Sequence, residues 1–222
     1  MNLTLFDLDG TLLPHDSDHA FGEFLIQIGW ADGALHRQRN DAFYADYQAG
    51  RLDMAAYVDF ATSPWRGRSA AELAEVQARF IDQVVRPELH TAALRLVDSH
   101  REQGDLLAVV TATNDFVTRP IAALFGIDTL IATELARDDQ GHVTGAVHGT
   151  PAFREGKISR VQDWLAAQQR TLDSFERCTF YSDSTNDLPL LAHVSHPVAT
   201  NPSPALERHA RERGWPVLKL FE

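Results

Sequence analysis

Three short apolar runs that end abruptly in polar residues most constrain what this chain can fold into. The runs occupy residues 3–6, 106–110 and 178–181, and each is followed within two positions by an aspartate or a threonine. Continuous apolar runs of this length indicate strands that are buried on both faces. The residues between them carry apolar side chains at helical spacing, so strands alternate with helices. This order predicts an α/β fold with a parallel sheet, whose ligands bind outside the carboxyl ends of the strands.

Further strands are marked more weakly in the sequence. Residues 129–132, 196–199 and 217–220 carry short apolar stretches that fit additional strands. The polar turn at 138–141 lies between two alternating stretches and predicts a small hairpin, which we place at about 133–150. The three stretches would extend the sheet, and the hairpin would project from it.

The segment between the first and second runs contains helix patterns only. Apolar residues recur at i, i+3, i+4 and i+7, which is the spacing of one helix face. They are Phe21, Phe24, Leu25 and Ile28, and again Leu73, Val76, Phe80 and Val84. We therefore expect two units. Residues 1–14 and 87–222 would form the sheet-containing core, and residues 15–86 would form a helical unit inserted after the first strand.

Composition excludes several classes of function. The chain has 20 Lys and Arg against 31 Asp and Glu, a formal charge of −11, which argues against nucleic acid or anionic lipid as a partner. It has neither a membrane-spanning apolar run nor a basic, apolar leader, so we expect a cytoplasmic protein. The one cysteine, Cys178, lies inside an apolar run and is predicted to be a core residue without a catalytic role.

The first polar cluster, Asp7-Leu8-Asp9-Gly10-Thr11, is the sharpest chemical feature of the sequence. Two carboxylates just past a strand can bind a hard cation through one carboxylate and a nearby carbonyl, while the second carboxylate moves a proton. The alternative is a solvated acidic turn, since Asp9-Gly10 is also ordinary turn chemistry.

A second acidic cluster follows the third apolar run, with Asp183 first and Asn186 and Asp187 behind it. A cation held by Asp7 and Asp183 would neutralise charge on a phosphoryl group, which is the main demand of phosphoryl transfer. The alternative is that Asp187 caps the next helix.

Two further residues could contact a phosphate. Thr111 precedes a predicted helix, so its hydroxyl and the following backbone N–H groups, starting at Ala112, could hold phosphate oxygens at a helix N-terminus. Thr113 or Asn114 could instead cap that helix. Lys157 opens another predicted helix and could bring an ammonium to a site crowded with carboxylates, although a lone lysine is usually exposed.

These four clusters, in this order, resemble the four motifs of the haloacid dehalogenase superfamily. The residues that carry the resemblance are Phe6 to Leu12, then Thr111, then Lys157, then Asp183 to Asp187. The helical insertion and the hairpin lie where the phosphoserine phosphatase-like branch carries a helical cap and a short flap. The resemblance thus implies a Rossmann-like core with an inserted α-helical cap, and a Mg²⁺-dependent phosphomonoesterase.

The resemblance also implies a role for each motif residue. In this family the first aspartate attacks phosphorus to give an aspartyl-phosphate, and the second serves as general acid and base. Mg²⁺ is held by the two carboxylates of the first and fourth motifs and by one backbone carbonyl. In this sequence the nucleophile would be Asp7 and the acid/base Asp9, and the metal would be held by Asp7, Asp9 and Asp183. The phosphate would be bound by Thr111, Ala112 and Lys157, with Asn186 and Asp187 as supporting residues.

The substrate implied is a small amino-alcohol phosphate. Asp16 stands where phosphoserine phosphatases place a glutamate for the substrate's amino group, and it or Ser17 could equally cap the next helix. The stretch 111–114 departs from their serine followed by glycines, and similar proteins of this branch include histidinol-phosphate phosphatases. Four insertion arginines are candidates for a substrate carboxylate, namely Arg37, Arg39, Arg51 and Arg66. The ten histidines show no zinc-ligand spacing.

Two other classes of function remain open at this point. A receiver-like phospho-acceptor also combines an acidic pocket, Mg²⁺ and an aspartyl-phosphate, but it needs neither Asp9 nor a cap. A phosphomutase would use the same acids and keep the phosphoryl group from water.

Overall fold

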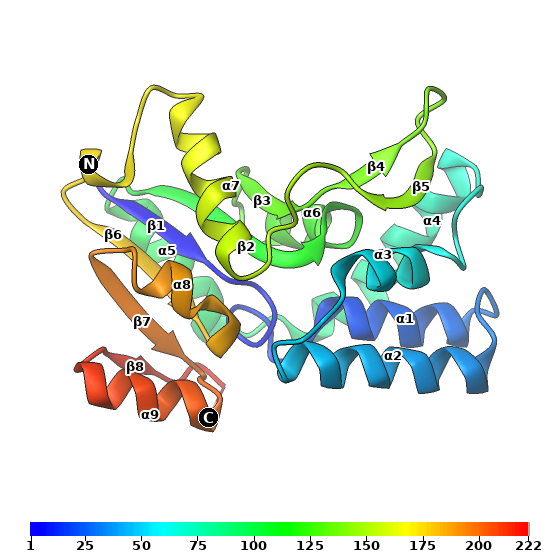
Figure 1. The fold of residues 1–222 in the computed structure, drawn as a ribbon, viewed down its shortest axis with the longest axis horizontal. Coiled ribbons are helices and arrows are strands. Elements are labelled where there is room, and N and C mark those ends of the chain that lie inside the picture. The colour runs from blue at the N-terminus through cyan, green and yellow to red at the C-terminus, as the bar shows by residue number, and fades with distance from the viewer. Residues whose placement is uncertain (222) are drawn as a thin grey trace.

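A six-stranded parallel sheet forms the centre of the computed structural model, which describes residues 1–221. The strand order is β3-β2-β1-β6-β7-β8, so β1 lies in the interior between β2 and β6. The α/β fold with a parallel sheet is therefore confirmed (Figure 1). The strands are β1 (Leu3–Phe6), β2 (Leu106–Asn114), β3 (Leu130–Thr133), β6 (Cys178–Ser182), β7 (His196–Thr200) and β8 (Val217–Leu218).

Helices cover both faces of the sheet because successive residues of its inner strands point to opposite sides. Phe6 belongs to the apolar cluster that includes residues of α5 and α6, whereas Leu5 belongs to the cluster that includes residues of α7 and α9. This gives the three layers expected when crossover helices bury a parallel sheet. The helices are α5 (Thr91–Glu102), α6 (Asp115–Leu124), α7 (Glu155–Ala166), α8 (Leu188–Leu191) and α9 (Pro204–Arg213), with 3-10 turns at Leu172–Ser174 and Thr185–Asp187.

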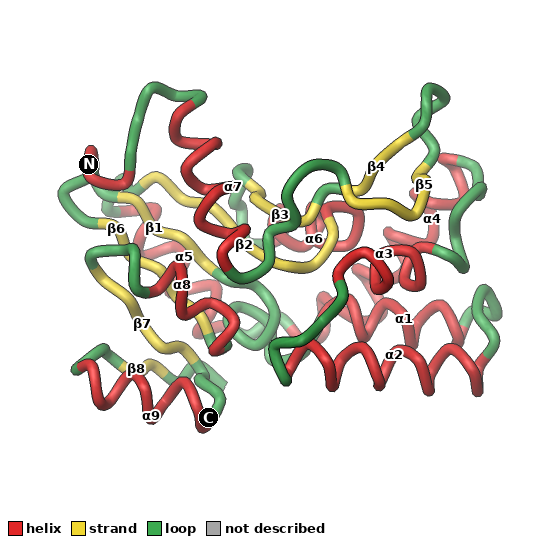
Figure 2. Tube along the Cα trace, in the orientation of Figure 1, coloured by secondary structure: helices red, strands yellow, loops and turns green. Residues whose placement is uncertain are grey.

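The segment between β1 and β2 is helical, as predicted, and lies beside the sheet (Figure 2). Asp16, Asp32 and Asp53 each precede a helix and accept a hydrogen bond from a backbone N–H in its first turn. Capping of this kind satisfies donors that the helix itself leaves free. The elements are α1 (Ser17–Gln27), α2 (Gly33–Gln48), α3 (Met54–Thr62), α4 (Ala70–Phe80), a π-helical turn (Ile81–Val85) and a 3-10 turn (Arg86–Glu88).

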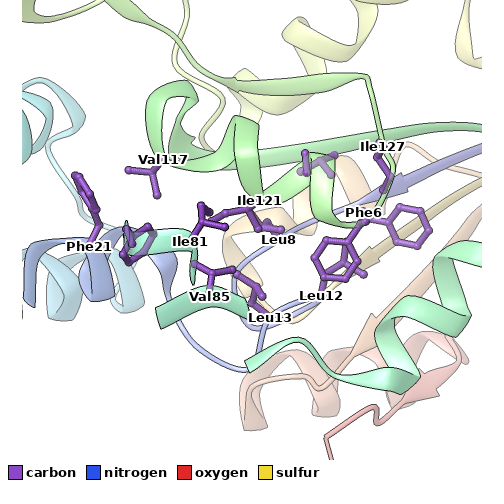
Figure 3. Packing of buried hydrophobic residues seen from close by; sticks show 14 of the residues in the cluster. Phe6, Leu8, Leu12, Leu13, Phe21, Ile81, Val85, Val117, Ile121 and Ile127 are labelled. Carbon is purple, nitrogen blue, oxygen red and sulfur yellow. The ribbon is translucent and has the colours of Figure 1, made fainter. Parts of the chain in front are cut away.

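One apolar cluster runs without a break from the helical segment to the sheet. Phe21 and Ile81 from the helical segment share it with Leu8, just past β1, and with Ile121 of α6 (Figure 3). All four side chains are 7% exposed or less. The base of the helical segment is thus packed on the core, while the division at residues 14/15 and 86/87 stays a prediction.

The predicted hairpin is present and projects over the helical segment (Figure 1). It consists of β4 (Leu135–Arg137) and β5 (Val143–Val147), which pair antiparallel. The Arg66 guanidinium donates hydrogen bonds to the Thr144 carbonyl oxygen and to Asp59, and so joins β5 to α3. The hairpin is therefore held against the helical segment as well as against the core.

One boundary differs from expectation. The sequence predicts that the second strand stops at residue 110, but β2 continues to Asn114 because residues 113 and 114 remain buried and Asn114 still pairs with Thr133 of β3. Cys178 is buried at 3% exposure, as predicted for a core residue. Across residues 1–221, no helix combines the length and the apolar character needed to cross a bilayer.

Candidate active site

Asp7 lies at the carboxyl end of β1, in the interior of the sheet. Its backbone N–H donates to the Tyr181 carbonyl oxygen of β6, so the register of β1 and β6 continues through the residue. The carboxylate is buried at 2% exposure, and its Oδ1 lies 2.9 Å from the Lys157 ammonium. Its Oδ2 accepts a long hydrogen bond of 3.4 Å from the Thr11 hydroxyl. One oxygen of Asp7 is thus held firmly and the other is held weakly.

Lys157 lies in the first turn of α7 and bridges two carboxylates. Its Nζ is 2.7 Å from Asp187 Oδ2 and 2.9 Å from Asp7 Oδ1, and the side chain is 1% exposed. Burial lowers the pKa of Lys157, but the two carboxylates outweigh that effect and raise it above its usual value. The sequence alternative of an exposed lysine is therefore wrong, and the residue carries a buried positive charge.

Asp183 follows β6 and lies against the turn at Gly10 and Thr11. Its backbone N–H donates to the Thr11 hydroxyl at 3.1 Å. Gly10 has a φ of +75°, and a Cβ on it would come within 2.4 Å of Asp183 Oδ2. Burial, with repulsion from Asp7 and Asp187, raises the pKa of Asp183 well above its usual value. A glycine is thus required here by both the backbone and the carboxylate beside it.

The charges of this cluster fit a divalent cation. Asp7, Asp183 and Asp187 bring three carboxyl groups into a buried region that contains one ammonium, that of Lys157. Asp187 Oδ1 is also buried without a hydrogen-bond partner in the described chain. Within residues 1–221, no group of three or more His, Cys, Asp or Glu side chains is arranged as a metal site. The ligand set that the resemblance implies does not require such a group, because it consists of two carboxylates and the Asp9 carbonyl oxygen. Oxygen donors of this kind suit Mg²⁺.

Asp9 is held by two hydrogen bonds that orient its carboxyl group. Oδ1 accepts from the Ser17 backbone N–H at 2.7 Å, and Oδ2 accepts from the Thr113 hydroxyl at 2.8 Å. Burial, with repulsion from Asp16, raises the pKa of Asp9 to about 6. A carboxyl group with a pKa near neutrality can both give and take a proton under ordinary conditions.

Thr111 is buried at the end of β2, but it does not open a helix. It accepts a hydrogen bond from the Thr113 backbone N–H at 3.2 Å, and α6 begins four residues later, where Asn114 caps it. The prediction that Thr111 lies at a helix N-terminus is therefore wrong, because β2 extends farther than its apolar run. Thr111 and Ala112 nevertheless line the same pocket as Asp9.

Asp187 and Asn186 lie close to the site but contact different parts of the chain. The Asp187 carboxylate accepts from the Ser182 hydroxyl at 2.7 Å and from Lys157, and it makes no capping hydrogen bond to α8. The alternative that its side chain caps the next helix is wrong. The Asn186 side-chain amide donates to the Tyr47 carbonyl oxygen at 2.8 Å and so links the site to the end of α2.

A pocket opens from Asp9 toward the helical segment. Asp16 lines it and also caps α1 by accepting from the His19 backbone N–H at 2.8 Å, so both roles weighed from the sequence are compatible. Burial, with repulsion from Asp18, raises the pKa of Asp16 to about 6. The lining consists of Asp9, Asp16, Asp18, Phe43, Tyr44, Tyr47, Leu52, Met54, Tyr57, Thr111, Ala112 and Thr113.

The arginines proposed to bind a substrate carboxylate lie elsewhere. Arg37 pairs with Glu23, Arg51 pairs with Asp46, Arg66 pairs with Asp59, and Arg39 lies over the Phe60 ring. None of the four is among the described residues that line the pocket. Helical periodicity does not show which face of an inserted helix turns toward a distant loop, so the four arginines could not be ranked from their sequence positions.

Several residues of this site were not predicted to belong to it. Thr11 bridges Asp7 and Asp183, Thr113 holds Asp9, and Asp18 lines the pocket. The threonine at position 11 adjoins the first acidic pair, so its place in the motif was a usable signal. Asp18 lines this pocket together with Tyr44, Tyr47 and Tyr57, and only the packing of α1 against α2 and α3 brings these residues together.

Comparison with known proteins identifies relatives over the whole chain. The family model for haloacid dehalogenase-like hydrolases matches residues 4–192. A histidinol-phosphatase of Neisseria meningitidis is 46% identical over 219 residues, which cover 99% of each chain. A phosphoserine phosphatase of Mycobacterium tuberculosis is 30% identical over 222 residues, covering 96% of this chain and 68% of the relative.

Solved structures agree with these relatives. A protein of unknown function from Bordetella pertussis superposes with a TM-score of 0.93 at 47% identity, and 99% of each chain is covered. A substrate-bound phosphoserine phosphatase superposes with a TM-score of 0.68 at 17% identity, covering 97% of this chain and 91% of the other. At that identity the second likeness supports the fold alone.

Proposed function

This chain belongs to the haloacid dehalogenase-like hydrolases and is a phosphoric monoester hydrolase, and from that premise we propose that it cleaves an amino-alcohol phosphate through an aspartyl-phosphate on Asp7. Asp7 supplies the nucleophile. Its Oδ2 accepts a long hydrogen bond from Thr11, while Lys157 fixes Oδ1 and so orients the carboxylate. Attack by Oδ2 forms the new bond to phosphorus as the bond to the ester oxygen breaks.

Asp9 handles the proton in both half-reactions. In the first it protonates the departing ester oxygen, and in the second it takes a proton from the water that attacks phosphorus. This second attack breaks the bond to Asp7 and releases inorganic phosphate. The hydrogen bonds from Ser17 and Thr113 fix the carboxyl group, and its pKa of about 6 leaves both protonation states accessible.

Charge neutralisation is divided between the chain and a cofactor. Three groups would hold Mg²⁺: the carboxylates of Asp7 and Asp183 and the carbonyl oxygen of Asp9. When bound, the ion offsets the charge of the phosphate dianion. Lys157 supplies one fixed positive charge at Asp7. The hydroxyl of Thr111 and the backbone N–H of Ala112 would hold the phosphate oxygens. Asp187 keeps Lys157 in place, and Asn186 joins this loop to α2.

One observation carries the choice of substrate: among the described residues that line the pocket there are aspartates but no lysine or arginine. Phosphoserine presents a carboxylate, which would meet Asp9, Asp16 and Asp18 without a cation to bind it. Histidinol phosphate presents an ammonium and an imidazole, and no carboxylate. The charge of the pocket therefore favours histidinol phosphate, in agreement with the activity for which the Neisseria meningitidis relative is named.

Steady-state kinetics test this proposal. We expect kcat/KM for histidinol phosphate to exceed that for phosphoserine at least tenfold in the presence of Mg²⁺. Asp7→Asn should abolish turnover without unfolding the protein, and Asp9→Ala should slow the hydrolysis of both substrates. Equal rates for the two substrates would contradict the choice of substrate.

The same assays separate the other classes of function. Stable phosphorylation of the wild-type protein without release of phosphate would favour a receiver-like phospho-acceptor. Transfer of the phosphoryl group to a second alcohol would favour a phosphomutase. Stoichiometric release of inorganic phosphate, measured beside the free alcohol, is the result that the hydrolase predicts.

A further inference from the structure

We propose that Asp18, held by Asn114 in a pocket that Tyr57 also lines, is a second nitrogen-binding point, so that the enzyme selects phosphate esters whose alcohol carries two nitrogen donors. This inference rests on the proposed function, because it names a feature of the substrate that the same pocket would accept. It concerns binding selectivity, and it assigns Asp18 no part in the chemical step.

The Asp18 carboxyl group is buried and fixed in direction. It lies in the first turn of α1 with 6% exposure, and its Oδ1 accepts from the Asn114 side-chain amide at 3.1 Å. Tyr57 lines the same pocket, and its hydroxyl lowers the pKa of Asp18 in opposition to burial. An aspartate whose only role was to stabilise α1 through the helix dipole would stabilise it equally well from the exposed side of the helix. Burial of this one beside the pocket therefore calls for another explanation.

Asn114 holds Asp18 with a defined orientation. Its Oδ1 accepts from the Val117 backbone N–H at 3.2 Å as the cap of α6. The amide oxygen is thus committed to α6, so the amide nitrogen has to face Asp18. Because α6 follows directly on the strand that carries Thr111, the position of Asp18 is tied to the phosphate end of the site.

Among the described residues that line the pocket, none carries a positive charge that could pair with Asp18. The groups packed around it are Asp9, Asp16 and the hydroxyl of Tyr57, together with Asn114. Burial, with repulsion from Asp9, raises the pKa of Asp18 to about 7, and burial holds the pKa of Tyr57 well above its usual value. Tyr57 therefore stays a donor. A buried carboxylate without a cation is costly, and a donor that arrives with the substrate would relieve that cost.

The aromatic and thioether part of the pocket lining suits a flat group. Phe43 and Tyr44 of α2 and Met54 and Tyr57 of α3 line it, and Phe43 and Tyr57 are in edge contact at 5.3 Å between ring centroids. Aromatic and thioether side chains pack well against an unsaturated ring and attract a cation over the ring face. An ammonium near Asp16 and a ring nitrogen near Asp18 would use the two carboxylates of the pocket other than Asp9.

The inference predicts a selective effect of Asp18→Asn. Asparagine keeps the shape and can still accept from Asn114 and Tyr57, but it removes the charge that a second nitrogen would bind. We expect kcat/KM for histidinol phosphate to fall about 10- to 100-fold, mainly through KM, as for loss of a charge-assisted hydrogen bond. For 2-aminoethyl phosphate, which has one nitrogen, kcat/KM should change less than about twofold.

Controls separate this role from a structural one. Asp173→Asn makes the same change at an exposed position and should alter neither substrate. Thermal unfolding with and without 2-aminoethyl phosphate shows whether Asp18→Asn is folded. If it is not, Tyr57→Phe, which removes one hydroxyl and keeps the ring, should show the same selective loss at smaller magnitude.

The outcomes separate this inference from the proposed function. An equal loss of kcat/KM for both substrates, or no loss for histidinol phosphate, would overturn the role of Asp18 while the phosphatase proposal stands. A wild-type protein that hydrolyses p-nitrophenyl phosphate but neither amine phosphate would overturn the substrate proposal and this inference with it.

Discussion

Replacing Lys157 by methionine is expected to destabilise the protein far more than the loss of a surface ion pair would. The ammonium lies 2.7 Å from Asp187 and 2.9 Å from Asp7, and all three side chains are 3% exposed or less. Removing one partner from a buried pair costs about 3–5 kcal/mol, whereas exposed pairs contribute about 0–1 kcal/mol. For a chain of this size, such a loss lowers Tm by about 6–20 °C.

The loss of stability should also depend on pH. Without the ammonium, burial and mutual repulsion raise the pKa values of Asp7 and Asp187 further above those of the unfolded chain. A carboxyl group whose folded pKa is raised takes up a proton as the pH falls, and this protonation favours the folded state. The deficit of Lys157→Met should therefore be largest near pH 8 and smaller near pH 5.

Urea unfolding followed by tryptophan fluorescence measures this deficit, and the chain has four tryptophans. The experiment is run with EDTA, so that no metal ion replaces the missing charge. Lys219→Met is the matched control, because it makes the same change at an exposed position. The double variant Lys157→Met/Asp187→Asn should recover part of the loss. A deficit below about 1 kcal/mol at pH 8 would refute the reasoning.

Three further predictions follow from contacts outside this ion pair. Gly10→Ala should lower kcat/KM for p-nitrophenyl phosphate at least 100-fold, since the new Cβ would lie 2.4 Å from Asp183 Oδ2; wild-type rates would contradict it. Asp105→Asn should cost about 1–3 kcal/mol of unfolding free energy at pH 7. Burial raises the pKa of Asp105, but its hydrogen bonds, chiefly the one with His100, outweigh burial and lower the pKa below its usual value. The stability deficit of Asp105→Asn should therefore vanish as the pH falls below about 4. Cys178, whose pKa burial raises to about 12, should resist a thiol reagent at pH 8 until the protein unfolds.

The sheet and the order of its motifs were predictable from the sequence because apolar runs and their polar ends are local signals. Leu3 to Phe6 form a buried strand, and Asp7 follows it at the carboxyl end of the sheet, as expected. Lys157 required more than a local signal. A lysine at a helix start is usually solvated. The burial of Lys157 is favourable because it pairs with Asp7, just past β1, and with Asp187, in the 3-10 turn after β6.

The parts that could not be predicted depend on contacts between distant segments. The extension of β2 to Asn114 rests on pairing with β3, which a hydrophobic pattern does not record. The sequence position of Asp187 suggests a helix cap, but its carboxylate pairs with the Lys157 ammonium and makes no capping hydrogen bond. The pocket formed by Asp18 and Tyr57 depends on how three helices pack, so periodicity alone could not place those residues together.

The central claim is that Asp7 carries the phosphoryl group during turnover. Its most direct test is mass spectrometry of the protein after acid quenching during hydrolysis of histidinol phosphate with Mg²⁺. We predict one phosphoryl group on the peptide that contains Asp7 in the wild-type protein, and none on that peptide in Asp7→Asn. Full turnover by Asp7→Asn, or a phosphoryl group on another residue, would contradict the account.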